Sequence, residues 1–97
     1  MVTTLTASIP TYAEPIVHKV EIKDFTFIPY ELVVKTGDII EFRNGDYAPH
    51  TATATDHSFD TKKINKDVEI PIVAEKPGVY SYRCSFHPTM KGKIVVE

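Results

Sequence analysis

The segment from Cys84 to Met90 constrains this 97-residue chain more than any other, because it places three possible metal ligands at intervals of three residues. Cys84 offers a thiolate, His87 an imidazole and Met90 a thioether, and together they form most of a metal site. A second imidazole is needed to complete the set. His50, which follows a loop ending in proline, is the best candidate, although His57 lies close by. A site that joins residues 50 and 84 would tie two remote strands together.

Two imidazoles and one thiolate with a weak axial thioether are the donor set of copper electron-transfer sites, so copper is the metal to expect. Zinc is an alternative, because geometry and supply can reverse the usual preference of such ligands for copper(II). Taken singly, Cys84 could be a small buried hydrophobic residue, His87 a loop residue and Met90 a gap-filler. Only their combination and spacing indicate a metal site.

Short segments of alternating apolar and polar residues, separated by turn residues, predict β-strands throughout most of the chain. Neither a helical period nor an internal repeat is found, so we expect an all-β fold, an antiparallel Greek-key β-sandwich of seven to eight strands. Residues 1–15 have no clear period and read as an irregular N-terminal arm or a poorly paired first strand, and residues 16–97 form one domain. The expected strands lie within residues 16–22, 30–35, 40–44, 51–55, 68–72, 80–84 and 94–96.

The alternation also predicts which side chains point inward. Tyr82 and Cys84 share an inward face, which aims the cysteine sulfur into one end of the sandwich. Asn44 is expected to be buried beside the loop that carries His50, where it must be hydrogen-bonded. Tyr80 reads first as a core aromatic, and its position after Gly78 also resembles the tyrosine that closes a Greek-key corner through its hydroxyl.

Composition excludes several classes of function. A net charge of −2 gives no electrostatic reason to expect nucleic-acid binding. No apolar run approaches the roughly 20 residues that a membrane-spanning helix needs. The N-terminus has no secretory signal, so we expect either a cytosolic protein or a mature form from which a signal or anchor was removed. Cys84 is the single cysteine, which excludes an internal disulfide and leaves a thiol that metal ligation would explain.

The residues around the predicted site resemble the cupredoxins, a family of type 1 blue copper proteins. The spacing Cys-x2-His-x2-Met is the shortest in that family and is similar to the spacing in the amicyanins. The resemblance covers roughly residues 16–97, and it implies His50, Cys84, His87 and Met90 as the ligands of one type 1 copper ion. It rests on residues 78–84 with His87, Met90, Gly92 and the run 93–96, and on residues 37–44 with Pro49 and His50.

One position departs from the family pattern. Many cupredoxins carry an asparagine directly after the first ligand histidine, where its side chain pins the two ligand loops together, and here that residue is Thr51. A threonine hydroxyl could still bond across to the segment near Ser85, but it is shorter and stiffer.

The resemblance implies a mobile one-electron carrier that alternates between Cu(I) and Cu(II), and not an enzyme. The family is exported, so it implies a periplasmic or other extracytoplasmic location for the mature protein, which we expect to act as a monomer. It also implies transient redox partners, namely a quinoprotein amine dehydrogenase as electron donor and a cytochrome c as acceptor. Exposed apolar residues near His87 would form the docking surface; these are Tyr47, Pro49, Phe86 and Pro88.

Two other functions fit the same fold. A copper-binding or delivery protein would use similar ligands but exchange the metal readily with a partner. A fragment of a multicopper oxidase or nitrite reductase is less favoured, because the chain has no His-x-His pair to build a further copper centre. The other histidines have plain interpretations: His57 is expected in solvent, and His18 in a partly buried structural role.

Overall fold

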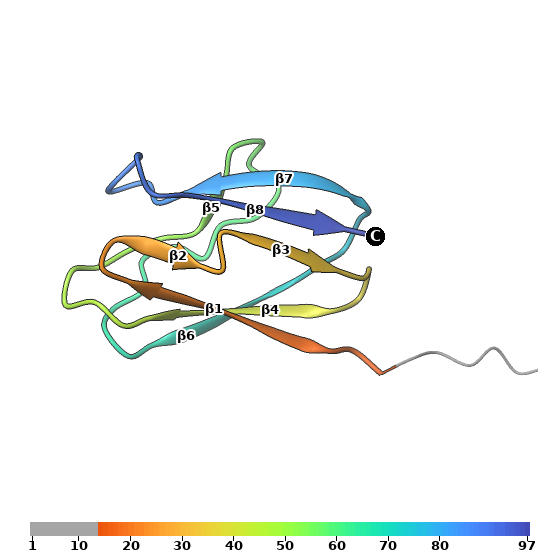
Figure 1. Ribbon diagram of the computed structural model, residues 1–97, viewed down its shortest axis with the longest axis horizontal. Coiled ribbons are helices and arrows are strands. Elements are labelled where there is room, and N and C mark those ends of the chain that lie inside the picture. The colour runs from red at the N-terminus through yellow and green to blue at the C-terminus, as the bar shows by residue number, and fades with distance from the viewer. Residues whose placement is uncertain (1–13) are drawn as a thin grey trace, which may run out of the picture.

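The structure, a computed structural model, describes residues 14–97, which form a two-layered β-sandwich (Figure 1). The predicted all-β sandwich is confirmed. Residues 1–13, most of the predicted arm, lie outside the described residues. No helix that could span a membrane occurs between residues 14 and 97. The strands of the described part are β1 (Val17–Lys23), β2 (Thr26–Ile28), β3 (Glu31–Val34), β4 (Ile39–Asn44), β5 (Thr53–Ala54), β6 (Glu69–Val73), β7 (Gly78–Arg83) and β8 (Lys91–Val96).

The two sheets are mixed, which corrects the expectation of antiparallel pairing throughout. One sheet has the order β2-β1-β4-β6 and the other β3-β8-β7-β5. β1 pairs with β4 and β3 pairs with β8 in parallel, whereas the remaining pairs are antiparallel. The parallel pairs arise because the chain crosses to the opposite sheet between the strands concerned. A returning strand is not held by a hairpin and can therefore pair in either direction.

An aromatic cluster fills the space between the sheets. Tyr82 is 1% exposed, and its ring centroid lies 4.7 Å from that of Phe27 and 5.5 Å from that of Phe42. Cys84 follows on the same inward face and is fully buried, as the alternation predicted. Gly92 lies opposite Tyr82 in the β7–β8 pair, and its lack of a side chain leaves room for the tyrosine ring. The thiol therefore sits at the end of a tightly packed core.

Some details of the strands were predicted and others were not. β5 holds only Thr53 and Ala54, because the two residues before it bond to loops instead of to a neighbouring strand. Pro71 lies in the edge strand β6, where a residue without an N–H is tolerated. The corner role of Tyr80 is confirmed, since its hydroxyl donates a 2.7 Å hydrogen bond to the carbonyl of Lys76.

A buried aspartate lies just beyond each end of β4. Asp38, before the strand, accepts hydrogen bonds from His18 Nε2 at 2.9 Å and from the backbone N–H groups of Ile16 and Lys35. The His18 bond, followed by the two backbone bonds, lowers the pKa of Asp38 to about 2. This contact confirms the structural role predicted for His18. Asp46 lies beyond the other end of β4, at the end of the sandwich where the β1–β2 turn and the β7–β8 loop also lie (Figure 1).

Candidate metal centre

His50, Cys84 and His87 bring one ligand atom each to a single point at this end of the sandwich. The sulfur of Cys84 lies 3.7 Å from Nδ1 of His50 and 3.7 Å from Nδ1 of His87, and the two nitrogens are 3.2 Å apart. His50 and Cys84 are buried, and His87 is half-buried. Three of the four residues that the sequence singled out are therefore neighbours in space.

The triangle of donor atoms has the dimensions of a metal site. The point equidistant from the three atoms lies about 2.1 Å from each, close to the roughly 2.0 to 2.3 Å over which zinc, a comparable ion, bonds to imidazole nitrogen and thiolate sulfur. Two imidazole nitrogens and a thiolate are also the trigonal donor set that suits copper. The residues present thus fit a copper ion.

Hydrogen bonds hold both the backbone and the ring of His50 in place. The backbone N–H and C=O bond to Ile64, at 3.2 and 2.7 Å, in an isolated bridge that anchors the ligand loop to the loop after β5. On the ring, Nε2 lies 2.9 Å from a carboxylate oxygen of Asp46. Because Nε2 then carries the proton, Nδ1 keeps a free lone pair on the side of Cys84.

Asp46 is a buried carboxylate that accepts hydrogen bonds from three groups. Besides His50 it accepts the backbone N–H groups of Asp24 at 2.8 Å and Phe25 at 2.9 Å. Burial alone would raise the pKa of Asp46, but these two bonds and the one from His50 outweigh it and hold the pKa below its ordinary value. Asn44, buried as predicted, accepts the N–H of Asp46 and donates to Ala48 and Ile64, so it holds the loop closed.

The loop between β7 and β8 is closed by two backbone bonds. Cys84 N–H donates to the carbonyl of Met90 at 3.1 Å, and Met90 N–H donates to the carbonyl of His87 at 2.9 Å. Met90 is buried, with 4% of its surface exposed. The short spacing in the sequence therefore makes a compact turn in which backbone hydrogen bonds link Cys84, His87 and Met90.

Thr51 joins the two ligand loops through its hydroxyl, as the sequence allowed. Its hydroxyl accepts the N–H of Ser85 at 2.8 Å and lies 2.9 Å from the Ser85 hydroxyl. Its own N–H donates to the sulfur of Cys84 at 3.3 Å. The substitution therefore preserves the link between the loops.

Asp46 and Phe25 are two residues of the centre that sequence analysis missed. The centroid of the Phe25 ring lies 5.0 Å from that of His50 and 4.9 Å from that of His87, edge to face in both cases. The signal for Phe25 was present: two alternating segments separated by two residues indicate a hairpin. Asp24 and Phe25 are not turn formers of the usual Asn-Gly kind, and nothing local shows which loop the turn meets.

Several apolar side chains are exposed on the loops that carry the candidate ligands. These are Tyr47, Pro49, Phe86 and Pro88. Phe25, 49% exposed, packs against His87. His57 is exposed and belongs to no described metal-ligand cluster, which agrees with its interpretation as a solvated residue.

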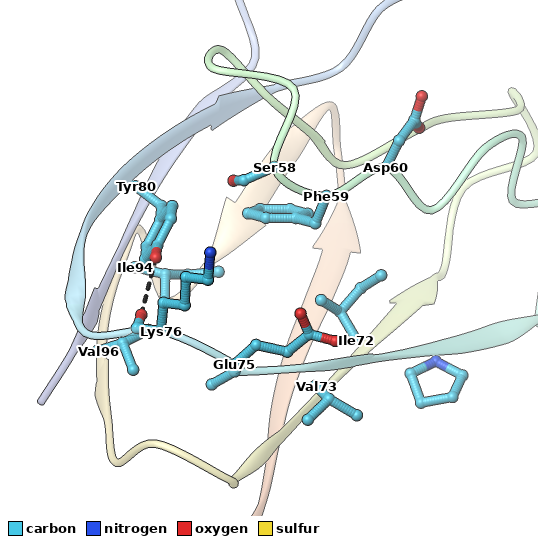
Figure 2. A pocket seen from close by; sticks show the side chains of 12 residues that line it. Ser58, Phe59, Asp60, Ile72, Val73, Glu75, Lys76, Tyr80, Ile94 and Val96 are labelled. Atoms are coloured by element: carbon cyan, nitrogen blue, oxygen red, sulfur yellow. Dashed lines mark hydrogen bonds between the residues drawn. The ribbon is translucent and has the colours of Figure 1, made fainter.

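A groove of about 500 Å³ lies away from the centre, between the edges of the two sheets (Figure 2). Apolar side chains from both sheets and the loop after β5 line it, among them Phe59, Ile72 and Ile94, together with Glu75 and Lys76. None of the candidate ligands lies in it.

Comparisons with known proteins agree with this geometry. An amicyanin-alpha of Methylorubrum extorquens is 33% identical over 88 residues, which are 81% of this chain and 71% of the relative. An amicyanin of Paracoccus versutus is 29% identical over 83 residues, 80% of this chain, and the chain spans 63% of that protein's length. Among solved structures, a copper-containing nitrite reductase of Thermus scotoductus is 31% identical with a TM-score of 0.79, over 95% of this chain and 25% of the enzyme.

The family model of the cupredoxin-like domain matches residues 1–96. This match covers almost the whole chain, and the described part brings together two imidazoles and a thiolate, the donor set that suits copper. The chain therefore belongs to the cupredoxin family, with copper as its cofactor.

Proposed function

We propose that this protein is a blue copper electron carrier in which His50, Cys84 and His87 are the trigonal ligands and Met90 is the weak axial ligand. The observation that carries the proposal is the triangle of donor atoms, preformed in a site whose thiol and first imidazole are fully buried. Copper bound there supplies the one-electron couple between Cu(I) and Cu(II).

The protein's part is to keep its donors still while the electron moves. Asp46 fixes the ring of His50, Thr51 N–H fixes the sulfur of Cys84, and the backbone bonds of the β7–β8 loop fix His87. The Thr51 bond also withdraws electron density from the thiolate, and such bonds tune the reduction potential of a metal site. A site held in this way needs little rearrangement when its charge changes.

His87 is the route for electrons in this proposal, because it is the least buried of the three donors. The apolar residues around it form a surface on which a redox partner can dock briefly. We infer an extracytoplasmic protein that acts as a monomer, takes electrons from a dehydrogenase such as a quinoprotein amine dehydrogenase and passes them to a cytochrome c. Its similarity to the amicyanins supports this inference.

A carrier is favoured over an enzyme because four protein donors leave no open position for a substrate, whereas catalytic metal sites keep one open. The match to the similar nitrite reductase covers only 25% of that enzyme's chain. A copper-delivery protein is the second candidate, and the exposed edge next to His87 is the feature that favours it, since a delivery site must be reached by a partner.

Electron exchange and copper release distinguish the two candidates. For the carrier we expect mixed Cu(I) and Cu(II) samples to exchange electrons fast enough to broaden NMR lines, and Cu(I) to pass only slowly to a chelator. Phe86→Asp should slow self-exchange at least about tenfold, because like charges would meet where two molecules dock. Val33→Asp is the control. Val33 is 52% exposed, close to the 51% of Phe86, but it lies on β3. Rapid copper transfer with undetectable self-exchange would instead indicate delivery.

A further inference from the structure

The turn between β1 and β2 touches the centre without supplying a ligand. Asp24 and Phe25 both have positive φ, at 52° and 57°, and connect the two strands as a two-residue turn. Positive φ at both positions is usual for the tight turns of β-hairpins, where asparagine, aspartate or glycine normally takes the first position and glycine the second. A bulky aromatic residue in this conformation is uncommon, and strain of this kind is concentrated at functional sites.

Asp46 holds this strained turn in place. One of its carboxylate oxygens accepts the N–H of Asp24, and the other accepts both the N–H of Phe25 and the ring Nε2 of His50. The carboxylate is buried, with a side-chain exposure of 8%. One side chain therefore fixes both the turn and the first imidazole ligand.

The consequence of this anchoring is the place of the Phe25 ring. The ring stands nearly perpendicular to both imidazoles, at 87° to His50 and 85° to His87. It packs against the two rings at once and therefore limits the rotation of each. Half of its surface stays exposed, so it also covers the centre on its solvent side.

We propose that the β1–β2 turn is a third, non-ligating loop of the copper centre. Phe25 in this turn and Asp46, which anchors the turn from the loop after β4, are positioning residues. Asp46 keeps the proton of His50 on Nε2 and increases the electron donation of its Nδ1 toward the metal. Phe25 keeps both imidazoles in their ligating orientation. This inference rests on the proposed function, because it takes His50 and His87 as copper ligands.

The chain contains a matched control for Asp46. Asp38 likewise accepts two backbone N–H groups and one histidine Nε2, at the same 2.9 Å distance, but it lies beyond the opposite end of β4. That strand has six residues, so about 20 Å separates the two aspartates along its axis. Asp38→Asn should lower stability through the same loss of acceptors and leave the copper centre unchanged.

The test compares Asp46→Asn with Asp38→Asn in the copper-loaded protein. Loss of a carboxylate behind a ligand histidine weakens metal binding by about 10- to 100-fold in comparable sites. We expect Asp46→Asn to weaken Cu(II) binding about tenfold more than Cu(I) binding, which raises the reduction potential by about 59 mV. The ¹⁵N shifts of the His50 ring in the diamagnetic Cu(I) protein should change as well. Asp38→Asn should change neither quantity.

Phe25→Gly tests the second residue without straining the fold. Glycine suits the positive φ of this position, so this variant should fold as stably as the wild type or more so, while it releases copper to a chelator roughly tenfold faster. The proposal is overturned if copper release is unchanged and the potential of Asp46→Asn matches that of Asp38→Asn. A wild-type protein that never turns blue would overturn the proposed function instead.

Discussion

A His50→Ala variant is expected to lose tight copper binding and about 2 to 3 kcal/mol of folding stability, the scale of loss for a large buried side chain replaced by alanine. His50 is fully buried, packs against Phe25 and donates to the buried carboxylate of Asp46. Its removal leaves a cavity and takes one donor from Asp46. The fall in copper affinity should exceed the 10- to 100-fold typical of changes behind a ligand.

Urea unfolding of the metal-free protein and a competitive copper titration measure the two effects separately. His57→Ala is the control, because His57 is exposed in a loop and should alter neither quantity by more than about 0.5 kcal/mol. A His50→Ala protein that binds copper as tightly as the wild type would mean that another residue, such as His57, supplies the imidazole.

Gly92→Ala is expected to destabilise the fold by about 3 kcal/mol, the upper part of the range for overpacking a core. A Cβ at this position would overlap the ring of Tyr82. The ring has no room to withdraw, since it is 1% exposed and packs against Phe27, Phe42 and Phe59. Because Cys84 lies two residues after Tyr82 on the same face, the copper spectrum should broaden as well.

Unfolding of Gly92→Ala, Tyr82→Leu and the double variant measures this contact. The smaller leucine should relieve the overlap, so the double variant should be more stable than the sum of the two single changes predicts. Simple additivity would show that the damage comes from a different cause, such as altered backbone entropy in β8.

The candidate ligands of the β7–β8 loop and most strands could be read from the sequence because their signals are local. Cys84, His87 and Met90 are spaced within one loop, and alternation showed that Cys84 points inward. The role of Thr51 was predictable for the same reason, since it follows His50 directly. These features depend on the spacing of residues and on the side of the strand to which each side chain points. Both can be read from a single segment.

The rest depends on how remote segments meet. The parallel pairing of β1 with β4 and of β3 with β8 is set by the crossing of the chain between sheets, which no segment encodes alone. The contact between Asp46 and the β1–β2 turn spans more than twenty residues and is visible only when both loops are in place. Phe25 was therefore an unassigned aromatic in the sequence and is part of the centre in the structure.

The central claim is that Cys84 is a thiolate ligand of a type 1 copper, and one spectrum tests it most directly. One equivalent of Cu(II) is added to the purified protein and to Cys84→Ala, and the visible and EPR spectra are recorded for both. We expect the wild type to show an intense blue thiolate-to-copper band with a narrow copper hyperfine splitting, and the variant to show neither. A pale, ordinary Cu(II) spectrum that is the same in both proteins would contradict the account, because Cys84 would then be structural.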